Sequence, residues 1–96
     1  MASYDTVQEA AERGAGVLQK DRKLEARFFR SSKGLVPVDA GAEKILDAAN
    51  KGIQSTPGLD DLVVQDIAEN PGSGHKVIRE KMDGGEAITI VPALKL

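Results

Sequence analysis

Apolar residues recur at intervals of three and four in three stretches of the chain, and each recurrence predicts an amphipathic helix. The first stretch follows Asp5, whose carboxylate can cap a helix N-terminus. The second, AGAEKILDAANK, follows Asp39, and Gly52 stands where a helix C-terminus favours a positive φ. The third is expected to begin with Thr56 as its N-cap and Pro57 at its first helical position.

The segment that follows the third stretch combines a loop with two further expected elements. Residues 70–74, Asn-Pro-Gly-Ser-Gly, have the composition of a loop. A short helix is expected over residues 75–83, ending at Gly84-Gly85. The β-branched residues of 86–91 predict a strand. This strand could complete the domain's own sheet or offer an edge to a partner, and because few strands are expected in the chain, we expect an unpaired edge.

Residues 24–38 fit two secondary structures. The segment LEARFFR could extend the first helix, or it could pair with LVPV as a β-hairpin around residues 31–34, and the turn composition favours the hairpin. Pro37 cannot donate to a sheet ladder, so its strand is expected at an edge. The predicted fold class is therefore α+β, with three to four short helices packed on a small antiparallel sheet, made of the hairpin near 24–38 and the C-terminal strand 86–91.

Length and composition are those of one small folded domain spanning residues 1–96. Hydrophobic residues make up 41% of the chain and charged residues 29%, a balance typical of folded proteins. Phe28, Phe29 and Tyr4 are the only aromatic residues, so an aliphatic core is expected. The chain has no cysteine, no signal-like N-terminus and no apolar run of about 20 residues. We therefore expect a cytoplasmic protein that does not contact a membrane.

The sequence gives little indication of catalytic, metal or cofactor chemistry. His75 is the only histidine and is expected to be exposed in the first turn of the short helix. Ser73 lies two residues before it, but nucleophilic catalysis also needs a third group that orients the base. The glycines before Lys76 do not match the spacing of a phosphate-binding loop. We expect no enzymatic activity, no cofactor and no metal.

A mixed basic and aromatic cluster and the last strand are the candidate binding surfaces. The segment Arg-Phe-Phe-Arg at 27–30 can stack on bases and contact phosphates. It equally matches one core phenylalanine, one half-exposed phenylalanine and two solvated arginines. The residues predicted to bind a partner are Arg27, Phe29, Arg30, Lys33, Ile88 and Ile90.

The charge distribution favours a protein partner over a nucleic acid. The net charge is −2, and residues 1–34 hold seven Lys/Arg against five Asp/Glu, a weak local excess. We expect a non-catalytic interaction or assembly protein of phage, mobile-element or accessory-subunit type, acting by homo-oligomerisation or by docking on a larger protein. The alternative is a small nucleic-acid-binding regulator of antitoxin type, with residues 6–29 as a degenerate helix–turn–helix. Residues 78–92, IREKMDGGEAITIVP, resemble a helix-to-strand passage in some bacterial antitoxins.

Overall fold

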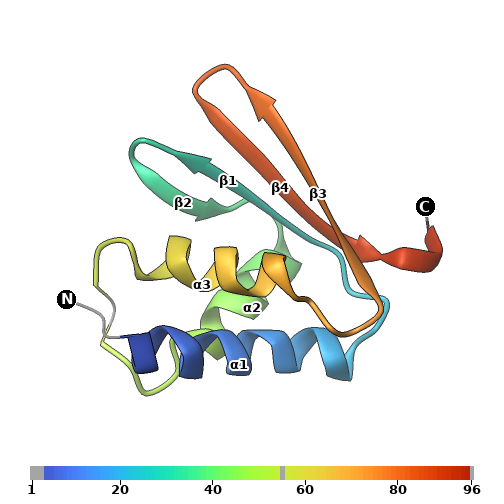
Figure 1. Ribbon diagram of the computed structural model, residues 1–96, viewed down its shortest axis with the longest axis horizontal. Helices are drawn as coiled ribbons and strands as arrows, with labels where there is room; N and C mark the ends of the chain where they lie inside the picture. Colours follow the sequence, from blue (N-terminus) through green and yellow to red (C-terminus); the bar gives the residue numbers. More distant parts are fainter. Residues whose placement is uncertain (1–3, 55, 96) are drawn as a thin grey trace.

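The computed structural model describes residues 4–54 and 56–95, in which helices cover one face of a four-stranded sheet (Figure 1). The α+β class with an antiparallel sheet is confirmed. The elements in chain order are α1 (Tyr4–Lys20), β1 (Ala26–Ser31), β2 (Gly34–Pro37), α2 (Ala40–Ala49), α3 (Leu59–Glu69), β3 (His75–Met82), β4 (Gly85–Pro92) and a short 3-10 helix, η1 (Ala93–Lys95).

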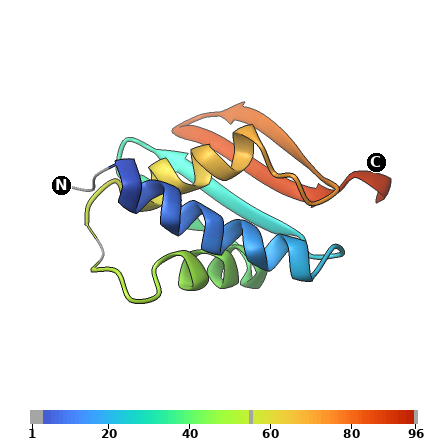
Figure 2. The ribbon, with the colours of Figure 1, turned by 60° about the horizontal axis from the view of Figure 1, so that its bottom comes forward.

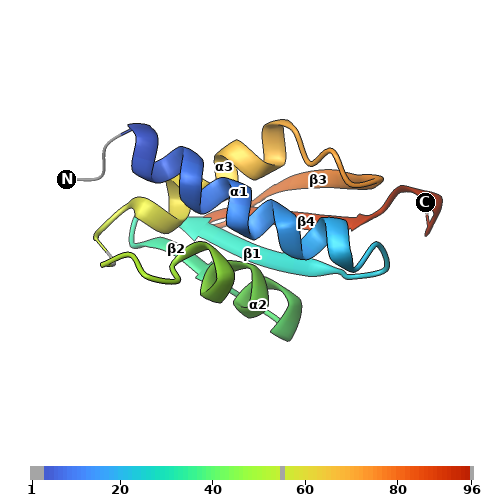
Figure 3. The same cartoon turned by 90° about the horizontal axis from the view of Figure 1, so that it is seen from below.

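Helix α1 lies between α2 and α3 on the side of the helices that faces away from the sheet (Figure 3). Gly14 makes this close packing possible, because a Cβ atom built there would lie 2.9 Å from Ile67 Cδ1 and 3.2 Å from Ile45 Cγ2. The helix runs through Gly14 without a break and is followed by a turn and by β1. Residues 6–29 therefore do not form a helix–turn–helix.

The sheet has the strand order β2-β1-β4-β3, and all neighbouring strands are antiparallel. The hairpin expected within 24–38 is confirmed as β1 and β2, and Pro37 lies in an edge strand as predicted. The prediction that the C-terminal strand is an edge is wrong. β4 is central and pairs with β1 on one side and with β3 on the other, for example Ile88 with Phe28 and Ile90 with Val77.

The helix expected over residues 75–83 is instead the strand β3, and it forms a hairpin with β4. Asp83 and Gly84 make the two-residue turn, in which Gly84 has φ +86°. Val77 packs against the core, whereas Ile78 points to the opposite face. Pairing with β4 thus outweighs the helix propensity of the Lys, Arg and Glu residues in this segment.

The two N-caps predicted for the second and third helices have different outcomes. The Asp39 carboxylate accepts a hydrogen bond from the Ala42 N–H at 2.9 Å, so it caps α2 as predicted. Helix α3 begins two residues later than expected, with Gly58 at its N-cap in the left-handed region. The Thr56 hydroxyl makes no hydrogen bond, and the Thr56 carbonyl instead accepts from the Leu59 N–H at 3.1 Å.

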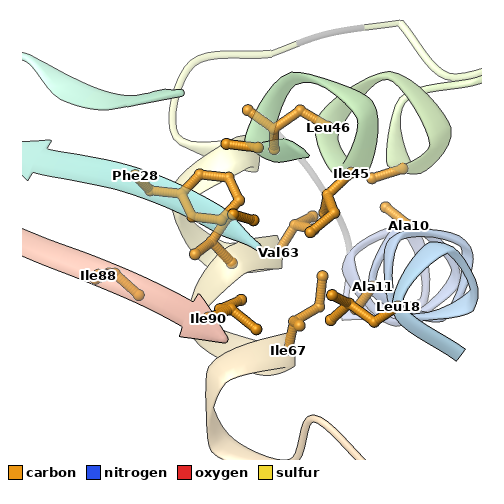
Figure 4. Close-up of a cluster of buried hydrophobic side chains, with 14 of the residues drawn as sticks. Ala10, Ala11, Leu18, Phe28, Ile45, Leu46, Val63, Ile67, Ile88 and Ile90 are labelled. Atoms are coloured by element: carbon orange, nitrogen blue, oxygen red, sulfur yellow. The ribbon is translucent and has the colours of Figure 1, made fainter. Parts of the chain in front are cut away.

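One aliphatic core lies between the sheet and the helices (Figure 4). β1 contributes Phe28, which is 1% exposed, and β4 contributes Ile88 and Ile90, both fully buried. These side chains meet Ile45 of α2 and Val63 of α3 in the same cluster. No helix of the described residues covers the other face of the sheet (Figure 2).

Candidate functional site

The uncovered side of the sheet carries large apolar side chains where polar residues would be expected. Successive side chains of a strand point to opposite faces, so the partners of the core positions face away from the helices. Large side chains on this face that are exposed are Val36 (52%), Val38 (61%), Ile78 (43%) and Met82 (52%). Phe29, Ala87 and Thr89 lie between them and are half-buried. We call these seven residues the open face.

Phe29 lies on β1, one of the two central strands of the sheet, and points to the open face. It pairs with Val36 of β2 and with Ala87 of β4. Its ring lies against Gly85, where an added Cβ would come within 2.9 Å of two ring carbons. Phe28 points the other way into the core. The expectation of one core and one half-exposed phenylalanine is therefore confirmed.

Arg27 lies at the rim of the open face and is engaged by acidic residues. Its guanidinium donates to Glu25 Oε1 at 2.9 Å and to Asp39 Oδ2 at 3.1 Å. The bond to Glu25, and after it the bond to Asp39, raise the pKa of Arg27. Burial of Asp39 opposes its ionisation, but bonds from the Ala42 N–H and from Arg27 outweigh this and lower the pKa of Asp39. The charge of Arg27 is thus locally balanced.

Arg30 and Lys33, the other basic residues predicted to bind a partner, do not lie on the open face. Arg30 points to the helix side, where its Nε donates to Asp61 Oδ1 of α3 at 2.6 Å. This bond to Asp61 raises the pKa of Arg30. Lys33 is exposed in the turn between β1 and β2. The basic cluster expected from residues 27–33 is therefore divided between two faces and a turn.

Ile88 and Ile90 also lie away from the open face. Both are fully buried against the helices because β4 is a central strand and they face inward. The prediction that they contact a partner rested on an exposed edge at β4, and that premise is wrong. The exposed apolar residues of the sheet were missed by sequence reasoning. The available signal was the Asp83-Gly84 pair, a turn dipeptide that marks the hairpin whose first strand carries two of them.

Ser73 and His75 form a buried pair at the start of β3, which corrects the expectation of an exposed histidine. The Ser73 Oγ and His75 Nδ1 atoms are 2.7 Å apart, and His75 Nε2 lies 2.9 Å from the Leu24 carbonyl oxygen. A carbonyl only accepts, so Nε2 carries a proton and donates to it, and in the neutral ring Nδ1 accepts from the serine hydroxyl. The two residues are 4% and 7% exposed. This arrangement ties β3 to the segment before β1.

A shallow depression of about 570 Å³ lies where the two hairpin tips approach the N-terminus of α3. Its lining includes Arg30, Asp61, Lys81 and Glu86. Arg30 is bonded to Asp61, and Glu86 accepts from Arg79 at 3.1 Å, so most of these charges are already paired. The side chains of Ser31 and Ser32 complete its polar lining.

Within residues 4–54 and 56–95, no group of three His, Cys, Asp or Glu side chains is placed to hold a metal ion. None of the helices in this part of the chain combines the length and apolar character needed to cross a bilayer. Comparisons with protein-family models, curated proteins and solved structures gave no match to this chain.

Proposed function

We propose that the protein is a non-catalytic assembly protein that associates with further copies of itself through its sheet. The observation that carries the proposal is the open face. An antiparallel sheet with one face packed on a core normally presents polar side chains on the other. Here Val36, Val38, Ile78 and Met82 are all at least 43% exposed on one face. Exposed apolar side chains gathered on one face of a sheet indicate an interaction site.

A protein partner fits this surface better than a nucleic acid does. Phosphate contacts require free cationic groups. Arg27 is already held by Glu25 and Asp39, and Arg30 by Asp61. The Phe29 ring and Ala87 lie at the middle of the face, with Val36 and Ile78 on the outer strands, and these apolar groups gain from burial against other apolar groups.

We favour a second copy of the chain as the partner because the open face continues to a strand that can pair. Ile78 and Met82 lie on β3, which forms one edge of the sheet. Association there would shield apolar side chains and satisfy backbone groups at the same time. A small domain with a thin core gains stability from such association.

Light scattering coupled to size-exclusion chromatography tests the proposal. We expect the wild-type protein at tens of micromolar to have at least twice the 10.2 kDa mass of one chain. Ile78→Ser should weaken association at least about tenfold. Leu62→Ser is the matched control, because Leu62 is similarly exposed (51%) but lies on α3. A single species near 10.2 kDa, or equal effects of the two substitutions, would contradict the proposal.

A further inference from the structure

The two edges of the sheet differ in their capacity to pair with another strand. β2 has four residues and contains Pro37, which blocks continued pairing. β3 has eight residues, His75–Met82, and no proline. Within the described residues, β3 pairs with β4 and with no other strand. An edge of this length is a template for a further strand unless its side chains prevent addition.

The exposed side chains of β3 are arranged symmetrically about Ile78. On the same side of the sheet as the open face, Lys76 lies two residues before Ile78, and Glu80 lies two residues after it. We propose, building on the proposed function, that two copies pair antiparallel along β3 about a two-fold axis at Ile78. Lys76 then lies opposite the partner's Glu80, Ile78 opposite the partner's Ile78, and Glu80 opposite the partner's Lys76. Opposite charges in directly facing positions stabilise antiparallel strand pairs.

The helix-side residues of β3 are compatible with this register. Val77 lies opposite the partner's Arg79. The Arg79 guanidinium is held by Gln65 Oε1 at 2.8 Å and Glu86 Oε1 at 3.1 Å within its own chain. Its aliphatic stem therefore lies beside the partner's Val77 while its charge stays paired. Lys81 lies opposite the partner's His75, whose ring is buried and bonded within its own chain.

The other symmetric registers are less favourable. A two-fold axis perpendicular to the joined sheet keeps the open faces of both copies on the same side. Residues that face each other across the two β3 strands must then point to the same side, so each possible axis passes beside one residue and its copy in the partner. A centre at Arg79 places two arginines opposite each other, and a centre at Glu80 does so for two glutamates. Like charges in facing positions destabilise the pair. A centre at Val77 sets Lys76 against Ile78 and aligns only residues 75–79.

Pairing at Ile78 would join the two sheets into one of eight strands. The open faces of both copies would then form a continuous surface, with the two Ile78 side chains at its middle. Val36 of β2 and Val38, which follows β2, would remain exposed at the two far edges of this sheet.

Charge exchange tests the facing pairs. Lys76→Glu converts both facing pairs to Glu–Glu and should raise the dimer dissociation constant about tenfold or more. Glu80→Lys should do the same, and the double variant Lys76→Glu/Glu80→Lys should restore the wild-type constant. Lys44→Glu on α2 is the control, with the same change of charge at an exposed site away from β3. A double variant as weak as either single variant would overturn the proposal.

Cysteine crosslinking reads the register directly, because the chain has no cysteine of its own. Ile78→Cys should give a disulfide-linked dimer on mild oxidation, since facing Cα atoms in an antiparallel pair are about 4.5–5.5 Å apart. Lys76→Cys and Glu80→Cys should not crosslink singly. In this register each is offset from its own copy by four residues, about 13 Å. The double variant Lys76→Cys/Glu80→Cys should crosslink.

The outcomes separate the two proposals. Crosslinking of Glu80→Cys without that of Ile78→Cys would show another register and overturn the inference while leaving self-association intact. A dimer that is weakened by Ile78→Ser but keeps its dissociation constant in Lys76→Glu and Glu80→Lys would also overturn the inference alone. A wild-type protein that is monomeric at tens of micromolar would contradict the proposed function as well.

Discussion

Phe28 and Phe29 are adjacent in the sequence, but replacing each with alanine should destabilise the fold by very different amounts. Phe28 is 1% exposed, and in the sheet it lies between Pro37 of β2 and Ile88 of β4. Phe28→Ala leaves a cavity that the surrounding strands and helices cannot close, and such changes cost about 3–5 kcal/mol. A domain of this length has a total stability of about 5–14 kcal/mol. The substitution should therefore remove a large part of it.

Phe29 is half-buried on the open face. Phe29→Ala leaves no closed cavity because the site opens to solvent, so we expect a cost of about 1–2 kcal/mol. Its effect on dimers paired along β3 should be small, because Phe29 lies on β1 and β4 separates β1 from β3.

Urea unfolding followed by circular dichroism distinguishes the two variants, at a protein concentration low enough for the monomer to dominate. With a slope of about 1.5 kcal/mol/M, Phe28→Ala should lower the midpoint by about 2–3 M and Phe29→Ala by about 1 M. Equal midpoint shifts, or a larger shift for Phe29→Ala, would refute the assignment of the two rings to opposite faces.

Two further predictions concern α2 and its first turn. Asp39→Ala should cost about 1–2 kcal/mol of stability at pH 7 through loss of the helix cap. Because folding lowers the pKa of Asp39, the stabilisation by its carboxylate is complete above the ordinary pKa of 3.8 and is lost as the pH falls below it. The unfolding midpoints of wild type and variant should therefore converge in acid, and a constant difference between them would contradict this. Gly41→Ala should lower the melting temperature and cost about 1–3 kcal/mol of stability, because the added Cβ would collide with the Glu25 carbonyl oxygen. Gly16→Ala is the control and should be neutral or stabilising, because its Cβ would meet open space. A larger loss of stability for Gly16→Ala than for Gly41→Ala would refute the contact.

Local signals in the sequence were sufficient for several elements. Asp39 was identified as a cap because only its own backbone neighbours are needed to use its carboxylate. Pro37 was placed at an edge because its missing N–H excludes a central strand. The Asp83-Gly84 pair was a comparable signal for the second hairpin, since Asp-Gly between strands is a strong turn indicator. It was overlooked because Lys, Arg and Glu before it favour a helix.

The position of β4 depended on information that is not local. Its β-branched residues identified it as a strand, but its neighbours are β1, far away in the sequence, and β3, which was predicted to be a helix. Without β3 the strand had only one partner and was placed at an edge. The same omission hid the open face, because Val36 and Ile78 share a surface only once all four strands are in order.

The central pairing of β1 with β4 has a consequence for synthesis of the chain. β1 ends at Ser31 and β4 begins at Gly85, so 54 residue steps separate them. At about 5–20 residues per second, the ribosome needs about 3–11 s to bridge this interval. During that time Phe28 lacks its facing Ile88, and the β1 edge that β4 will occupy is open. Until β4 has been synthesised, the edge of β1 that later pairs with β4 is therefore free to pair with other chains.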